Sequence, residues 1–190
     1  MTTTTQQAIF VRWASDEDIP DIISISSSAT KKFGSIPELA DLAGSDETPE
    51  KVHEWLTKGR IYVADVDGVA AGFIAAHPMD DTLYIAEIST SAAYQGRGVG
   101  GALINAVFGW ATERATQEGS RTARVSLTTY ADVPWNGPWY RKHGFKEVEA
   151  EAIGPLHVAK MTRDQEERDL VRPGYRRCCM FWEKKTGEEG

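Results

Sequence analysis

Apolar residues in the first third of the chain follow two different spacings. Residues 9–14 (IFVRWA) are rich in β-forming side chains, which predicts a short strand. In residues 15–33 apolar positions recur every three or four residues, which predicts an amphipathic helix with Ser15 as its N-cap. Residues 34–48 have no clear period and contain Gly, Pro and Asp, so we expect a loop with one turn of helix. Residues 49–59 start with a proline and end with a glycine, which predicts a second short helix.

Three strands are predicted next, with no helix between them. They cover residues 60–66, 69–77 and 82–90, where β-branched, aromatic and other apolar side chains dominate. An Asp-Gly dipeptide separates the first two strands, and such a pair between β-rich runs is typical of a tight hairpin turn. Consecutive hairpins indicate a sheet that is mostly antiparallel.

The rest of the chain alternates between helix and strand. A long helix starts in a run of glycines and stops at Gly119. Its predicted buried stripe is Val99, Ala102, Leu103, Ala106, Val107 and Trp110. The later elements are a strand at 123–130, a short helix at 136–144, and strands at 146–153 and 174–184. Because no repeat or linker interrupts this order, we expect a single domain over residues 1–190, with a core at about 9–184 and frayed ends.

Composition narrows the classes of partner. A formal net charge of −7 argues against nucleic acid, because phosphate contacts need clustered Lys and Arg. No apolar run reaches the length of a membrane span, and the first residues do not read as a secretory leader. The two cysteines, Cys178 and Cys179, are adjacent and suit a reducing compartment, so we expect a cytoplasmic protein. The four histidines lack metal-ligand spacing, and no metal site is expected.

The glycines at the start of the long helix pose the main functional question. Gly96, Gly98, Gly100 and Gly101 lie within six positions, in the stretch YQGRGVGG at 94–101, which we name the glycine loop. A Rossmann loop does not fit, because three hairpin strands precede the glycines and no strand with an acidic residue follows at the required distance. A P-loop does not fit, because no Gly-Lys-Ser/Thr follows. A helix N-terminus with a bare backbone suits a pyrophosphate, so the glycine loop predicts an anion cradle.

Two motifs in this order resemble the GNAT superfamily of N-acetyltransferases. YQGRGVGGAL is similar to its acetyl-coenzyme A signature Q/R-x-x-G-x-G/A, with Gln95, Gly98 and Gly100 in the signature places. NGPWYRKHGF is similar to the second conserved region of the family, in which Asn136 and Tyr140 have counterparts. The resemblance covers about residues 9–184. It implies an α+β fold, with a mixed, mostly antiparallel central sheet of about seven strands flanked by about four helices on both faces.

The resemblance also implies acetyl-CoA as cosubstrate and gives the residues that would bind it. The backbone of the strand before the glycine loop would pair with the pantetheine arm, and the loop would hold the pyrophosphate. For Asn136, capping the short helix is the alternative to binding the arm. For Arg97 and Lys142, a solvated surface role is the alternative to a phosphate contact. The expected cofactor residues are Ile88, Ser89, Thr90, Gln95, Gly96, Arg97, Gly98, Val99, Gly100, Gly101, Asn136 and Lys142.

Acetyl transfer to an amine poses two proton problems. The ammonium must lose a proton before it attacks, and the thiolate leaves more easily with one. The resemblance implies that Tyr140 points at the thioester sulfur as general acid, and packing of the short helix is its alternative role. Glu87 is the candidate base, because it is a lone carboxylate in the apolar run LYIAEIST. Binding the substrate cation without moving a proton is the alternative role of Glu87.

Acceptor choice is expected from segments 33–48, 130–135 and 154–174, the last a long charged insertion. The candidate acceptor residues are Phe33, Tyr130, Asp132 and Trp135, since aromatic and acidic side chains suit an amine. The leading hypothesis is a small primary amine as substrate, with no nucleic-acid or membrane partner and a possible homodimer. A protein N-terminal or lysine acetyltransferase is one alternative, and a catalytically silent CoA-binding sensor is another.

Overall fold

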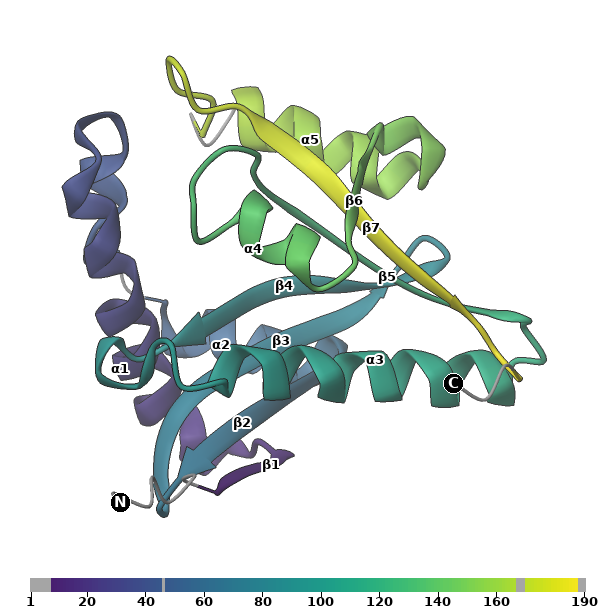
Figure 1. Cartoon of the computed structure of the whole chain (residues 1–190), viewed down its shortest axis with the longest axis horizontal. Helices are drawn as coiled ribbons and strands as arrows, with labels where there is room; N and C mark the ends of the chain where they lie inside the picture. Colours follow the sequence, from purple (N-terminus) through teal and green to yellow (C-terminus); the bar gives the residue numbers. More distant parts are fainter. Residues whose placement is uncertain (1–7, 46, 167–169, 188–190) are drawn as a thin grey trace, which may run out of the picture. The chain divides into compact units, whose positions relative to one another are not determined.

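A computed structural model describes residues 8–45, 47–166 and 170–187 (Figure 1). Of the ends predicted to fray, 1–7 and 184–190, residues 1–7 and 188–190 lie outside these ranges, as do residues 167–169 of the insertion. Lys184 and Lys185 belong to the last strand instead. The strands are β1 (Ile9–Trp13), β2 (Arg60–Val66), β3 (Val69–Met79), β4 (Thr82–Thr90), β5 (Thr122–Tyr130), β6 (Lys146–Val148) and β7 (Arg177–Lys185). They form one mixed sheet in the order β1-β2-β3-β4-β5-β7-β6, which confirms the predicted α+β class and strand number.

Helices connect these strands. The described part of the chain holds the α-helices α1 (Ile19–Thr30), α2 (Pro49–Lys58), α3 (Val99–Gln117), α4 (Gly137–Lys142) and α5 (Pro155–Glu166). It also holds five 3-10 helices, η1 (Asp16–Asp18), η2 (Lys31–Ser35), η3 (Pro37–Leu42), η4 (Ala92–Tyr94) and η5 (Ala150–Ala152). No helix in the described ranges is long and apolar enough to cross a membrane.

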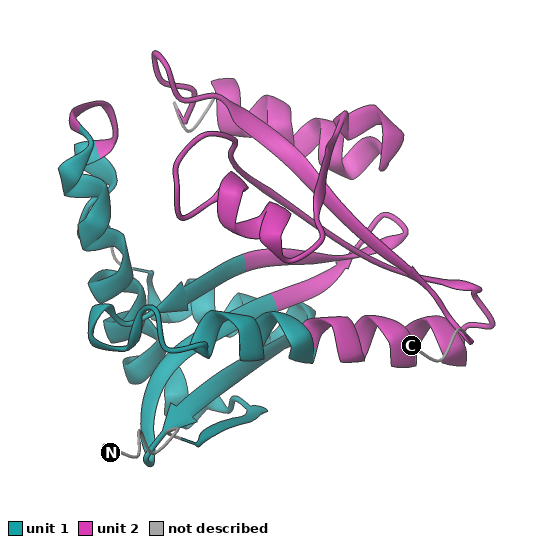
Figure 2. Cartoon of the chain, in the orientation of Figure 1, with its two compact units in different colours: residues 1–36, 40–75, 87–106 teal, residues 37–39, 76–86, 107–190 magenta. Residues whose placement is uncertain are grey.

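The chain divides into two compact units (Figure 2). Unit 1 comprises residues 1–36, 40–75 and 87–106, and unit 2 comprises residues 37–39, 76–86 and 107–190. This division does not test whether the chain is a single domain, which therefore stays a prediction.

Unit 1 contains β1, β2, α1 and α2, and it carries the glycine loop. β1 pairs antiparallel with β2, and Trp13 lies opposite Tyr62. Trp55 of α2 packs near Phe73 of β3, with ring centroids 6.2 Å apart. Ser15 holds an N-cap position as predicted, but the element it starts is η1, and the Asp18 carboxylate accepts from its backbone N–H at 2.8 Å.

Unit 2 is built on the pairing of β5 with β7. The two strands are antiparallel from Thr122, opposite Lys185, to Tyr130, opposite Arg177. β5 also pairs parallel with β4, but only over three residues, from Leu83 to Ile85 on β4. Cys178 and Cys179 are buried, unbonded thiols on β7, as a strand interior predicts.

Three predictions about individual elements need correction. The strand expected at 146–153 ends at Val148, and η5 follows, because Ala and Glu at 149–152 favour helical over extended backbone. The loop expected at 34–48 contains the whole of η3 and the end of η2. The buried stripe of α3 is rotated from the predicted one. Its fully or nearly fully buried members are Val99, Leu103, Ile104, Val107, Ala111 and Ala115, whereas Ala102, Ala106 and Trp110 are half-buried.

Candidate active site

The glycine loop turns the chain from β4 into α3 by means of two left-handed residues. Gly96 has a φ of 76° and Gly98 a φ of 88°, a region that side chains with a Cβ rarely adopt. Nothing lies within 4 Å of a Cβ built on Gly96, so backbone conformation, not space, requires this glycine. Ala102 N–H donates to Gly98 O at 3.0 Å, so Gly98 supplies the first carbonyl of α3. The amides that follow Gly98 precede the first helical bond and are available to an anion.

Side chains of unit 1 brace this loop. Gln95 Nε2 donates to Thr90 O at 3.1 Å, which ties the loop to the end of β4. Ala92 N–H donates to Ser28 Oγ at 3.0 Å, which ties η4 to α1. The Arg97 guanidinium lies 5.4 Å from the ring centroid of Tyr94. The loop is therefore held in its turn by the surrounding chain, and Arg97 is exposed at its tip.

One residue that shapes the loop was not predicted. A Cβ on Gly72 of β3 would lie 2.8 Å from Val99 Cγ1 and 2.9 Å from Ser89 O. Gly72 thus allows β4 and the start of α3 to approach β3 closely. A lone glycine inside an apolar strand was the available signal, because it often marks such an approach.

Glu87 lies on β4, two residues before the buried Ser89, so both side chains project from the same face of the strand. Ser89 Oγ donates to Glu87 Oε1 at 2.8 Å, which orients the half-buried carboxylate. Burial lowers the pKa of Lys32 in η2, and the negative charge of Glu87 opposes that shift. Lys32 is therefore a neighbour of the candidate base that the sequence did not single out. Ile88 and Thr90 are half-buried on the same strand.

The second motif forms α4 in unit 2, and the loop after β5 clamps it. A Cβ on Gly137 would lie 2.1 Å from Ala131 O, so only glycine fits there. Arg141 Nη1 donates to the same carbonyl at 3.2 Å. Tyr140 is 8% exposed, and its ring meets that of Phe145 edge-on at 5.7 Å between centroids. Lys142 is exposed at the end of the helix.

The four candidate acceptor residues have different surroundings. Tyr130 is buried, and the Arg177 guanidinium lies 4.9 Å from its ring centroid. Asp132 is exposed, and its Oδ2 lies 3.8 Å from Arg176 Nε. Trp135 is half-buried, and Phe33 is half-buried within η2. The cation contact at Tyr130 is thus made by the protein's own Arg177.

The insertion before β7 forms α5, whose first turn is anchored by polar groups of unit 2. The Asp80 carboxylate accepts from the backbone N–H groups of Leu156 and His157 and lies 2.7 Å from His157 Nδ1. His157 Nε2 lies 2.8 Å from Ser126 Oγ. This order of groups matches a Ser–His–Asp triad. However, Ser126 and His157 are fully buried, so no substrate reaches the hydroxyl and the arrangement is structural.

A second polar anchor lies two turns further along α5. Asp164 is fully buried, and its carboxylate pairs with Lys160 and with Arg177 Nη2, the latter at 3.1 Å. Arg177 Nη2 also donates to Thr128 Oγ1 at 3.2 Å. Hydrogen bonds and ion pairs with Lys160 and Arg177 hold the pKa of Asp164 below its usual range against the effect of burial, so the buried carboxylate is charged.

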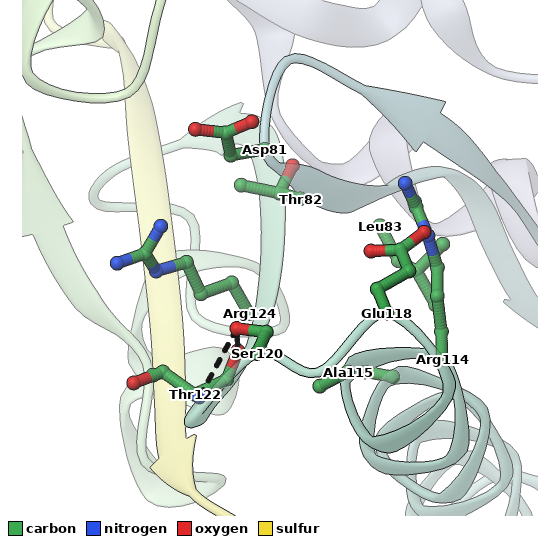
Figure 3. Close-up of a pocket in the computed structure, with 10 residues that line it drawn as sticks. Asp81, Thr82, Leu83, Arg114, Ala115, Glu118, Ser120, Thr122 and Arg124 are labelled. Carbon is green, nitrogen blue, oxygen red and sulfur yellow. Dashed lines mark hydrogen bonds and ion pairs between the residues drawn. The ribbon is translucent and has the colours of Figure 1, made fainter.

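A cavity of about 280 Å³ lies in unit 2, at the C-terminal end of α3 (Figure 3). Arg114 and Glu118, which line it, form an ion pair at 2.7 Å, and Arg124 of β5 lines it as well. None of the residues predicted for cofactor, acceptor or catalysis lines this cavity. It is therefore separate from the candidate site.

A protein-family model described as "Acetyltransferase (GNAT) domain" matches residues 57–147, which include the glycine loop and α4. Residues 57–147 therefore form a GNAT acetyltransferase domain. This domain match makes the protein an acyltransferase, and the fold supports acetyl transfer from acetyl-CoA. The GNAT resemblance read from the two motifs is thereby confirmed.

Solved GNAT structures share the fold at low sequence identity. The ribosomal-protein-S18-alanine N-acetyltransferase of Escherichia coli has a TM-score of 0.64 and 14% identity, over 96% of this chain and 98% of that one. The PaiA N-acetyltransferase of Thermoplasma acidophilum, in complex with coenzyme A, has a TM-score of 0.62 and 16% identity, over 94% of this chain and 99% of that one. The N-acetylglutamate synthase of Neisseria gonorrhoeae, complexed with coenzyme A and N-acetyl-glutamate, has a TM-score of 0.60 and 17% identity, over 93% of this chain and 35% of that one. One relative is named for a protein acceptor and another for a small product, so the fold leaves the acceptor open.

Proposed function

We propose that this GNAT protein transfers acetyl from acetyl-CoA to the primary amine of a small molecule. The observation that carries the proposal is the glycine loop at the start of α3. Its left-handed Gly96 and Gly98 and the Gln95 brace present bare backbone amides at the N-terminus of a 19-residue helix. A pyrophosphate is the ligand that such amides and the helix dipole favour.

The residues of the loop fit the cosubstrate on this criterion. Val99, Gly100 and Gly101 supply the first amides of α3, and Gly100 and Gly101 carry no side chain that would keep phosphate oxygens away. Arg97 is exposed beside them and is suited to a phosphate contact. The backbone of Ile88, Ser89 and Thr90 would hold the pantetheine arm, as the family resemblance implies. Asn136 is the other residue proposed to contact the arm. Acetyl-CoA itself supplies the activated acetyl group as a thioester.

Glu87 is proposed as the base that removes a proton from the acceptor ammonium, directly or through a water. The Ser89 hydrogen bond supports this role, because it fixes the orientation of the carboxylate on β4.

Tyr140 is proposed as the acid that gives its phenolic proton to the departing thiolate. A phenol keeps its proton at neutral pH, since its ordinary pKa is about 10. The clamp on α4 by Ala131 supports the role, because it fixes the backbone that carries Tyr140. A packing role for the ring against Phe145 is the competing interpretation.

A small acceptor is favoured over an extended peptide by the structure of the variable segments. η2 and η3 cover residues 31–35 and 37–42, and the described part of the insertion contains α5, so a large part of both segments is helical. Within the proposal, Phe33, Tyr130, Asp132 and Trp135 remain the candidate acceptor contacts, and the possible homodimer stays a prediction.

A panel of amines and peptides tests the proposal by following release of free CoA thiol from acetyl-CoA. Turnover with small primary amines and not with peptides is the expected result. Turnover confined to peptides would favour a protein acetyltransferase. Tight CoA binding without turnover for any acceptor would favour a silent CoA sensor.

A further inference from the structure

Asn136 does not use its side chain as a helix cap. It holds the N-cap position of α4, yet its side chain makes no capping hydrogen bond. Instead, Asn136 Nδ2 donates to Thr129 Oγ1 at 2.7 Å. Thr129 lies near the end of β5 and is 2% exposed, so its hydroxyl is a fixed partner. The capping alternative considered from the sequence is therefore wrong for this side chain.

The backbone of Asn136 is already fixed by other contacts. Its N–H donates to Val133 O at 2.9 Å, and its carbonyl accepts from Tyr140 N–H at 3.0 Å. The next residue, Gly137, is pressed against Ala131 O. These contacts fix the backbone but leave the side-chain amide able to rotate. The hydrogen bond to Thr129 stops that rotation.

That bond also decides which end of the amide remains for a ligand. An asparagine side chain has two donor hydrogens on nitrogen and two acceptor lone pairs on oxygen. With Nδ2 held by Thr129, the carbonyl Oδ1 is the end of the amide that remains as an acceptor for a ligand. The pantetheine arm of coenzyme A contains amide N–H groups, which are donors of the matching kind.

We propose that Thr129 is a positioning residue for the cosubstrate: it orients the Asn136 amide so that Oδ1 accepts from a pantetheine N–H. This inference rests on the proposed function, because it takes Asn136 to contact the arm. It adds Thr129, which does not touch the ligand, and it gives the direction of the hydrogen bond between Asn136 and the arm.

Calorimetric titration of the full chain with CoA tests the inference. Thr129→Val keeps the shape of the side chain and removes its hydroxyl, so the Kd for CoA should rise about threefold to tenfold, the range for one lost hydrogen bond. Thr129→Ser restores the hydroxyl and should stay within about twofold of wild type, by the same reasoning. Thr122→Val, on the same strand but distant from Asn136, is the matched control and should leave the Kd unchanged.

A double-mutant cycle separates positioning from general damage to the fold. Because Thr129 acts through Asn136, Thr129→Val should add nothing to the loss already caused by Asn136→Ala. If Thr129→Val weakens CoA binding as much in the Asn136→Ala protein as in wild type, the inference is overturned. It is also overturned if Thr129→Val binds CoA like wild type while Asn136→Ala binds it more weakly. If Asn136→Ala itself binds CoA normally, the cofactor contact in the proposed function fails first, and the inference fails with it.

A variant at Asn136 keeps the test decisive even if Thr129→Val does not fold. Asn136→Asp retains an acceptor oxygen for the ligand and loses the N–H donors. If Oδ1 contacts the arm, this variant should bind CoA several-fold more tightly than Asn136→Ala. Loss equal to that of Asn136→Ala would show that the amide N–H group faces the ligand, and it would overturn the proposed orientation.

Discussion

Asp80 Oδ2 lies 2.7 Å from His157 Nδ1 and also accepts the backbone N–H of His157, so one carboxylate holds both the ring and the first turn of α5. Burial lowers the pKa of His157 below its ordinary value despite the nearby carboxylate. Burial would raise the pKa of Asp80, but its hydrogen bonds from His157 and the α5 backbone place that pKa below the usual range. In the folded state both groups therefore bind protons less readily than in the unfolded chain.

The first prediction concerns the stability of this anchor against acid. A histidine whose folded pKa is depressed contributes stability above its unfolded pKa, near 6.5, and loses it as pH falls. The free energy of unfolding should therefore decline between pH 7.5 and 5.5. His157→Gln should cost ~1–3 kcal/mol at pH 7.5, because it disturbs two buried hydrogen bonds, and should flatten the decline.

Urea unfolding at both pH values measures this effect. The control is His53→Gln, since His53 is an exposed histidine, 60% accessible, beside Asp16. His53→Gln should keep the pH dependence of wild type. A His157→Gln variant whose stability falls with acid as steeply as wild type would contradict the assignment to His157.

The second prediction concerns the conformation of the glycine loop. Gly98→Val places a β-branched side chain at a φ of 88°, which strains the turn and narrows the approach to the amides of α3. The Kd for CoA should rise at least about tenfold, or ~1.4 kcal/mol. Gly109→Val is the control, because Gly109 lies on the exposed face of α3 with no atom within 4 Å of its built Cβ. Wild-type CoA affinity in a folded Gly98→Val variant would remove the basis for the anion cradle.

The third prediction separates proton transfer from positioning at Glu87. Glu87→Gln keeps an acceptor for Ser89 Oγ but cannot take a proton from the substrate. The rate at neutral pH should fall ~100- to 10,000-fold, and part of it should return at higher pH, where free amine is abundant. The exposed Glu183→Gln on β7 is the control and should leave the pH–rate profile unchanged. The same loss at every pH would assign Glu87 a positional role.

The fourth prediction tests Tyr140 as the acid. Tyr140→Phe keeps the ring contact with Phe145 and removes the proton, so kcat should fall ~100-fold while KM for acetyl-CoA stays near wild type. An acyl donor with a more acidic thiol should recover much of the rate. Tyr62→Phe, a buried tyrosine on β2, is the control and should be fully active. Full activity of Tyr140→Phe with both donors would leave only the packing role.

Local sequence patterns predicted the elements whose buried faces are apolar. β2, β3 and β4 followed from their β-rich composition, and the Asp67–Gly68 turn from its dipeptide, since both residues have positive φ. The glycine loop was predicted as a ligand cradle, but the reason for Gly96 is its backbone conformation. At Gly72 the reason is instead the close approach of neighbouring atoms. The sequence alone does not tell which of the two reasons applies at either glycine.

Polar burial explains most of what the sequence did not predict. The buried face of α5 carries His157 and Asp164, so apolar periodicity could not mark it as a packed helix. Thr129 is an unremarkable residue in a strand, and its bond to Asn136 depends on how the chain returns after β5. Such partners become visible only when the fold brings distant residues together, since no local spacing encodes them.

The polar underside of α5 also sets how its attachment responds to temperature. Heat-capacity changes on local opening scale with the apolar surface exposed, and polar surface contributes with the opposite sign. Lifting a helix whose buried side chains are a histidine and an aspartate exposes little apolar area of its own. The surface of α5 should therefore add less to the temperature dependence of the enthalpy of this opening than the surface of an apolar helix of the same length would.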